Sequence, residues 1–200
     1  NAEVEVSTVP YEAIENSVVL QINVQKGERV KISEINFLGT NAIADKRLAR
    51  ALKDTKEKRW WRIFKSSKYI EDSYEQDKMA LLALYNAKGY RDARIVRDSL
   101  YRTADDRVGL DIQIEEGNQF YFRNIYFTGN TKYASSKLDS ILKIKEGDVY
   151  DQQLLETKLY MNPKGLDLST LYQDDGYLQF QAIPVEILVE NDSIDIEIRM

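Results

Sequence analysis

The residue types that most often carry out acid–base or metal chemistry are scarce in this sequence. The 200-residue chain has no histidine and no cysteine, so it lacks the commonest general base and the commonest transition-metal ligands. Acidic pairs such as Asp105-Asp106 and Asp174-Asp175 fall in predicted turns, where solvated carboxylates are the simpler interpretation. We therefore expect no cofactor, no metal site and no enzymatic activity. A hydrolase that uses paired carboxylates is the alternative from another class, and a deep pocket holding two close acids would favour it.

A basic and aromatic stretch from Lys56 to Lys68 is the second candidate for chemistry. It contains six basic residues and one Glu, with Trp60, Trp61 and Phe64 among them. Aromatic and basic residues together suit a membrane interface, a nucleic acid or a protein partner. The structural interpretation is a lid in which the two Trp side chains pack over their own domain. The net charge of −5 argues against nucleic acid as the partner.

An internal repeat organises the elements around these residues. Ile35, Phe37 and Gly39 recur as Ile125, Phe127 and Gly129, 90 positions later. Both copies also change the phase of their apolar alternation just before these residues. A repeat of this length predicts two small units.

Each unit is expected to contain, in order along the chain, one strand, two helices and two further strands. The first unit has a strand near 30–38, helices at 44–53 and from about 73, and strands near 90–100 and 108–115. The second repeats this pattern, with its second helix interrupted at Asn162–Gly165 because proline cannot continue a helix. The glycines that follow first strands and second helices are predicted turn residues: Gly39, Gly89, Gly129 and Gly176. The fold class is α+β, with a three-stranded mixed sheet covered on one face by two helices.

This order of elements resembles that of POTRA domains. The features that carry the resemblance are the Gly-Asn turn, the Gly-Tyr pair after the second helix and a hairpin that ends in Glu116-Gly117. The Trp60-Trp61 insertion resembles that of the second POTRA domain in outer-membrane protein assembly factors. The resemblance implies that 28–117 is a second domain, 118–200 a third, and 1–27 the closing hairpin of a first.

The family implies a scaffold in the periplasm, attached to a C-terminal β-barrel of the outer membrane. Its implied partners are unfolded outer-membrane proteins and accessory assembly lipoproteins, which add a strand to an exposed sheet edge. A POTRA array from a two-partner secretion or autotransporter-assembly system is the alternative within this class. The short linkers, at 26–28 and 116–118, suggest limited articulation between units.

In this family the strand after the second helix lies at a sheet edge, here about 92–99 and 178–189. Pro184 fits an edge because it has no N–H to donate to a ladder. It either leaves an edge that accepts a peptide strand or blunts that edge against aggregation. The candidate partner-binding residues are Asp92, Arg94, Val96, Phe180, Ile183, Pro184, Val185 and Ile187.

Overall fold

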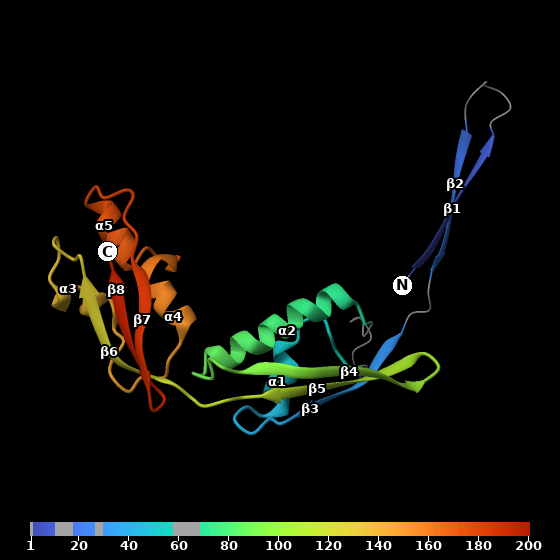
Figure 1. Cartoon of the computed structure of the whole chain (residues 1–200), viewed down its shortest axis with the longest axis horizontal. Coiled ribbons are helices and arrows are strands. Elements are labelled where there is room, and N and C mark those ends of the chain that lie inside the picture. Colours follow the sequence, from blue (N-terminus) through green and yellow to red (C-terminus); the bar gives the residue numbers. More distant parts are fainter. Residues whose placement is uncertain (1, 11–17, 27–29, 58–68) are drawn as a thin grey trace.

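The structure is a computed structural model that describes residues 2–10, 18–26, 30–57 and 69–200. It has a two-stranded hairpin followed by two units, each built from a three-stranded sheet and helices (Figure 1). The predicted α+β fold class and the tandem repeat are confirmed. Among the helices of the described residues, none is long and apolar enough to cross a membrane.

The N-terminal hairpin pairs β1 (Ala2–Pro10) with β2 (Val18–Lys26) in antiparallel register. Valine and isoleucine face one another across it, as in the pair Val6 and Ile22. These two side chains are each 55% exposed. The hairpin extends away from both units in Figure 1, so its apolar residues find no core among the described residues.

The first unit contains β3 (Lys31–Leu38), α1 (Asp45–Ala51), α2 (Glu71–Asn86), β4 (Arg94–Ala104) and β5 (Arg107–Glu115). Its strand order is β3-β5-β4. The central strand β5 runs parallel to β3 and antiparallel to β4. Both helices cover the same face of the sheet, and between them lies the core of Leu48, Leu81, Tyr85, Leu110 and Ile112.

The second unit contains β6 (Tyr121–Thr128), α3 (Ser135–Leu142), α4 (Gln152–Glu156), the π-helical turn η1 (Thr157–Met161), α5 (Leu168–Asp174), β7 (Ile183–Glu190) and β8 (Ser193–Arg199). The strand order, β6-β8-β7, repeats that of the first unit. The predicted interruption of the second helix is confirmed, because the chain turns at Asn162 and the helix resumes as α5. Asp151 begins α4 by accepting a hydrogen bond from the Leu154 N–H at 2.9 Å.

The phase change seen in the sequence is a β-bulge in each unit. The register with the central strand shifts between Ile32 and Glu34 in β3, and between Phe122 and Ile125 in β6. In the second unit Asp195 holds the bulge, because its carboxylate accepts from the Arg123 Nε at 2.8 Å and from the Asn124 N–H at 3.1 Å. An extra residue returns the apolar side chains to the core face after a break in alternation.

Candidate functional site

The strands predicted to be open edges, β4 and β7, are the outer strands of their sheets. Each pairs with a central strand on one side only, among the described residues. An outer strand presents unpaired N–H and C=O groups to which another extended chain can bond.

The β7 edge carries apolar side chains. Ile183 is 53% exposed, and Ile187, Leu188 and Val189 are each 47% exposed. Pro184 pairs with Ile198 of β8 and lies in this outer strand, as its lack of an N–H predicts. The strand also has a bulge between Glu186 and Leu188.

A groove of about 440 Å³ lies beside the start of β7, and we call it the β7 groove. The residues that line it come from η1, α5 and the chain leading into β7: Tyr160, Asp167, Ser169, Thr170, Gln173, Phe180, Gln181, Ala182, Ile183 and Pro184. Phe180 stacks on the buried ring of Tyr172 with 3.8 Å between ring centroids. Asp167 is buried and already accepts hydrogen bonds from the N–H groups of Asn162 and Thr170.

Exposed apolar side chains also lie within two positions of groove residues in the sequence of the second unit. Leu178 is 78% exposed, Leu166 67% and Met161 60%. Exposed apolar side chains that gather on one surface are typical of sites that contact another protein. The combination of an apolar edge and an adjacent groove is found on β7.

The β4 edge is more polar. Arg94 Nε donates to Glu115 Oε2 at 2.8 Å, and Lys78 Nζ to Asp98 Oδ2 at 3.2 Å. Burial, with the Asp98 charge nearby, raises the pKa of Tyr74 on the neighbouring helix well above its usual range. Val96 is 40% exposed and sits at a bulge between Ile95 and Arg97. This edge therefore offers backbone groups with charged side chains around them.

The structure corrects two of the predicted edge residues. Asp92 lies in the turn before β4, and Phe180 lies in a turn before β7, so neither belongs to an edge strand. Strand β7 begins five residues later than the predicted start at Leu178, because two turns bring Phe180 onto the Tyr172 ring. The other predicted residues lie in the two edge strands: Arg94, Val96, Ile183, Pro184, Val185 and Ile187.

Trp60, Trp61 and Phe64 lie outside the described residues. Sequence reasoning missed the helix side of the β7 groove, which Tyr160, Asp167 and Ser169 line. The polar N-cap Asp167 after the Pro163 interruption is the signal that could have shown where the helix resumes.

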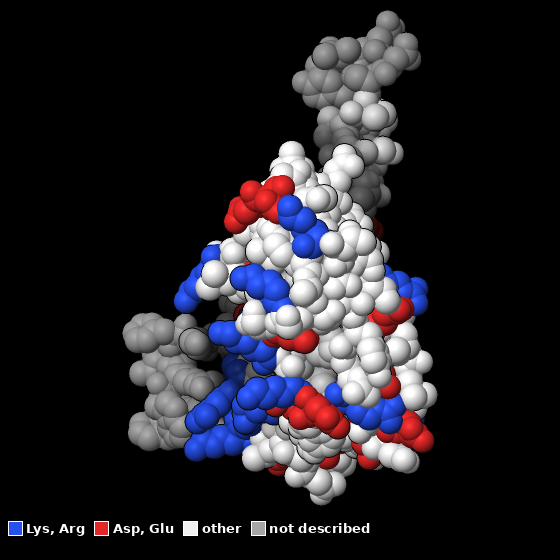
Figure 2. Space-filling view, turned by 90° about the vertical axis from the view of Figure 1, so that its left-hand side faces the viewer, with Lys and Arg blue, Asp and Glu red and all other residues white. Residues whose placement is uncertain are grey.

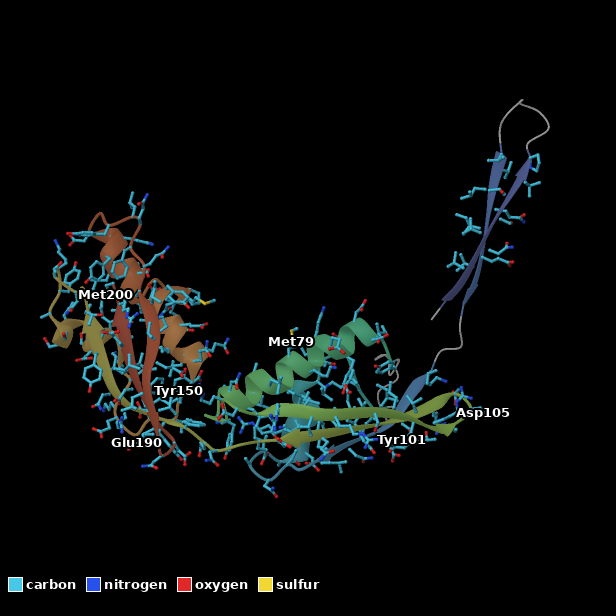
Figure 3. All side chains as sticks on the ribbon, in the orientation of Figure 1. Met79, Tyr101, Asp105, Tyr150, Glu190 and Met200 are labelled. Carbon is cyan, nitrogen blue, oxygen red and sulfur yellow. The ribbon has the colours of Figure 1, made fainter. Side chains whose placement is uncertain are left out.

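The junction between the units also touches β7. Arg91, in the turn after α2, donates from Nη1 to Glu186 Oε2 of β7 at 2.6 Å. The hydroxyl of Tyr150 donates to the other oxygen of Glu186 at 2.9 Å, and the Arg91 guanidinium lies 5.7 Å from the Tyr150 ring centroid. The Phe120 N–H donates to the Gly89 carbonyl at 2.8 Å. Figure 3 shows Tyr150 on the side of the second unit that faces the first.

The acidic pairs do not form a catalytic centre. Asp106 bonds Lys31 at 2.6 Å, and Asp175 bonds Lys132 at 2.8 Å in the other unit. Within the described residues, no group of three or more acidic side chains could hold a metal ion. Positive and negative side chains both occur on the face in Figure 2, where Lys and Arg gather at the lower left.

The comparisons with known proteins agree with this architecture. The POTRA family model, described as "Surface antigen variable number repeat", matches residues 30–117 and 120–199. The outer membrane protein assembly factor BamA of Neisseria meningitidis is 27% identical over 147 residues, covering 72% of this chain and 18% of that protein. A putative outer membrane protein assembly factor of Treponema pallidum is 26% identical over 167 residues, covering 80% of this chain and 18% of that protein.

A crystal structure of POTRA domains 3–5 of Haemophilus influenzae BamA shares the fold, with a TM-score of 0.52 at 17% identity. The alignment covers 100% of this chain and 72% of that one. The chain thus spans 18% of the length of each of the two curated relatives above. Two successive matches to one family model, falling on the two observed units, show that this chain belongs to the POTRA family, which is non-enzymatic.

Proposed function

We propose that this chain is a periplasmic scaffold and chaperone-like module of the machinery that assembles outer-membrane β-barrels. It binds unfolded outer-membrane proteins and accessory lipoproteins by adding their extended segments to the β4 and β7 edges. The similarity to BamA supports a role in this machinery, and the position of β4 and β7 as outer strands of their sheets supports the mode of binding.

The observation that carries the proposal is the β7 edge with the groove beside it. Backbone hydrogen bonds along an edge are independent of the incoming sequence, which suits a site that receives many different chains. Each such bond contributes roughly 1 kcal/mol net, so a short added strand binds weakly and leaves readily. The groove supplies a place for one apolar side chain of that strand.

We also propose that residues 1–27 are the closing hairpin of another POTRA unit, and that 28–117 and 118–200 are second and third units. The exposed valine and isoleucine side chains of the β1–β2 hairpin support the first assignment, because such a ribbon needs a core to cover it. The Trp60-Trp61 sequence supports the second.

Site-specific photo-crosslinking in cells, in the longer protein that contains this chain, tests the edge. Crosslinkers at Ile183, Val185 and Ile187 should capture outer-membrane proteins or lipoproteins, whereas one at Glu197 of the central strand β8 should not. Val185→Pro and Ile187→Pro should reduce capture by crosslinkers elsewhere on β7 several-fold, because each removes a backbone N–H.

Val185→Ala and Ile187→Ala are the matched controls, since they shorten the side chain and keep the N–H. Circular dichroism and thermal melting of each variant show whether the sheet is intact. Unchanged crosslinking in a proline variant that melts like the parent would refute edge binding. Equal crosslinking from the β7 positions and from Glu197 of β8, in the protein without proline substitutions, would also refute edge binding.

A further inference from the structure

The Glu116 carboxylate connects three elements at one end of the first unit: the end of β5, the turn after β3 and helix α2. Glu116 follows β5, and its oxygens accept hydrogen bonds from the N–H groups of Asn41, at 2.9 Å, and Ala42, at 3.0 and 3.1 Å. The buried hydroxyl of Tyr85, on α2, donates to Glu116 Oε1 at 2.8 Å. Burial works to raise the pKa of Glu116, but these donors outweigh it and the pKa is lowered.

The second unit repeats two of the three donors of this site, because the Thr131 N–H, which corresponds to that of Asn41, already donates to the Gly129 carbonyl at 2.8 Å. The Leu84-Tyr85 pair on α2 corresponds to Leu171-Tyr172 on α5. Both tyrosines meet a second tyrosine edge-to-face, Tyr90 at 6.1 Å and Tyr177 at 5.9 Å between ring centroids. The turn at 41–42 corresponds to the turn at 131–132 by the same 90-residue shift.

The sheet registers identify where the matching carboxylate would come from. Leu38 pairs with Gln113 in the first unit, and Thr128 pairs with Arg199 in the second. Met200 therefore stands where Ile114 stands, and Figure 3 shows it at the end of β8, beside the helices. A Cβ on Gly39 would meet the Ile114 carbonyl, and one on Gly129 would meet that of Met200, which supports the same register. The position that corresponds to Glu116 is two residues beyond Met200.

The Tyr172 hydroxyl is buried, and no hydrogen-bond partner for it exists among the described residues. The residue is 4% exposed, against 0% for Tyr85. The Lys132 N–H likewise bonds to no group in the described part of the chain, whereas its counterpart Ala42 bonds to Glu116. A buried hydroxyl is almost always paired in a folded protein, so this one points to a ligand.

We propose that the Tyr172 hydroxyl and the Lys132 N–H form a carboxylate-binding site, whose ligand is an acidic side chain two residues beyond Met200 in a chain that continues past β8. The ionised carboxylate accepts from Tyr172 and the turn together, as Glu116 does in the first unit. It ties the exit of β8 to α5 and to the turn after β6, and so fixes the direction in which the next segment leaves. This carboxylate-binding site is independent of the edge binding proposed above.

The test extends the chain after Met200 by Glu-Glu-Gly, the residues that follow Ile114, and compares it with an extension by Glu-Gln-Gly. The Glu form should melt about 3 °C or more above the Gln form at neutral pH. The difference should disappear below about pH 4, where the carboxylate is protonated, and shrink in a Tyr172→Phe background.

NMR gives a readout that does not depend on stability. The amide proton of Lys132 should move downfield in the Glu form only, as that of Ala42 should move upfield in Glu116→Gln. If Tyr172→Phe fails to fold, the Lys132 amide shift in the two extended chains still tests the proposal. Identical melting with an unchanged Lys132 amide would overturn the proposal, and so would a Lys132 shift of equal size in both extensions.

Discussion

At the scale of single residues, the turn after the first strand depends on a close backbone approach. Gly39 has a φ of +79°, and a Cβ placed there would lie 2.4 Å from the Ile114 carbonyl oxygen. Gly147 has a similar φ of +83°, but a Cβ there would meet nothing within 4 Å. The two glycines share the left-handed backbone and differ in the space around it.

This pair separates backbone strain from steric contact. Gly147→Ala should destabilise the fold by about 1–2 kcal/mol, the cost of a left-handed residue with a side chain. Gly39→Ala should destabilise it by at least twice that, because β5 must also move. Urea unfolding of the two variants measures the difference, and equal losses would mean that the turn relaxes without disturbing β5.

The sequence was informative at this scale because turn chemistry is local. The four predicted turn glycines, Gly39, Gly89, Gly129 and Gly176, have φ values of +79°, +84°, +82° and +93°. Asp151 is an N-cap as predicted. The hydrogen bonds to the Glu116 carboxylate could not be predicted, because their donors come from residues 31 to 75 positions away in the sequence.

At the scale of elements, the sequence predicted the order of the described strands, and the phase change falls where the register shifts in β3 and β6. The strand predicted near 90–100 is Arg94–Ala104, because the chain still turns at Arg91 and Asp92. The start of β7 was misplaced because the Tyr172–Phe180 stack is a tertiary contact that keeps residues 177–181 in turns. Local propensity carries no information on such a contact. The β7 groove depends on the same stack, so its helix side was missed with it.

We expect the bulge in β6 to make the second unit sensitive to acid. The Arg123 guanidinium, with hydrogen bonds from Asn124, lowers the pKa of Asp195 to about 2 from its ordinary 3.8. A lowered pKa in the folded state adds stability above the unfolded-state value, and that stability is lost as the pH falls from about 4 towards 2. The bulge should therefore loosen across this range.

Asp195→Asn tests this, because it keeps the shape of the side chain and removes its charge. The variant should melt below the parent at pH 7, and the gap should narrow as the pH falls below 4. Asp139→Asn, at an exposed acid on α3, is the control and should change little. A gap between parent and Asp195→Asn that stays constant down to pH 2 would contradict the assignment.

At the scale of the whole molecule, the junction links two units that have separate cores. The short linker at 116–118 predicted limited articulation, but it could not reveal the side chains that limit it. Arg91 and Glu186 are 95 positions apart in the sequence and share no motif. Both are partly buried, with side chains 28% and 33% exposed, so their ion pair is better shielded than one on the open surface.

Arg91 should therefore narrow the range of angles between the units. Its guanidinium bonds Glu186 and lies 5.3 Å from the Phe120 ring centroid and 5.7 Å from that of Tyr150, so one side chain contacts three residues of the second unit. Arg91→Ala leaves two hydrogen bonds across the junction in place: the Gly89–Phe120 backbone bond, and the bond from Gln119 Nε2 to the Lys88 carbonyl at 2.8 Å. Because Glu186 belongs to β7, the ion pair also connects the proposed binding edge to the first unit.

Distances between spin labels measure this directly, and the absence of cysteine in the chain makes the labelling specific. Labels at Met79 and Leu178, which are 71% and 78% exposed, report on the two units. Arg91→Ala should broaden the distance distribution, and high salt should broaden that of the parent in the same direction. Arg94→Ala is the matched control, because Arg94 bonds Glu115 within its own sheet and should leave the distribution unchanged. An equally narrow distribution in Arg91→Ala would mean that the hydrogen bonds of Phe120 and Gln119 to the first unit set the angle without the ion pair.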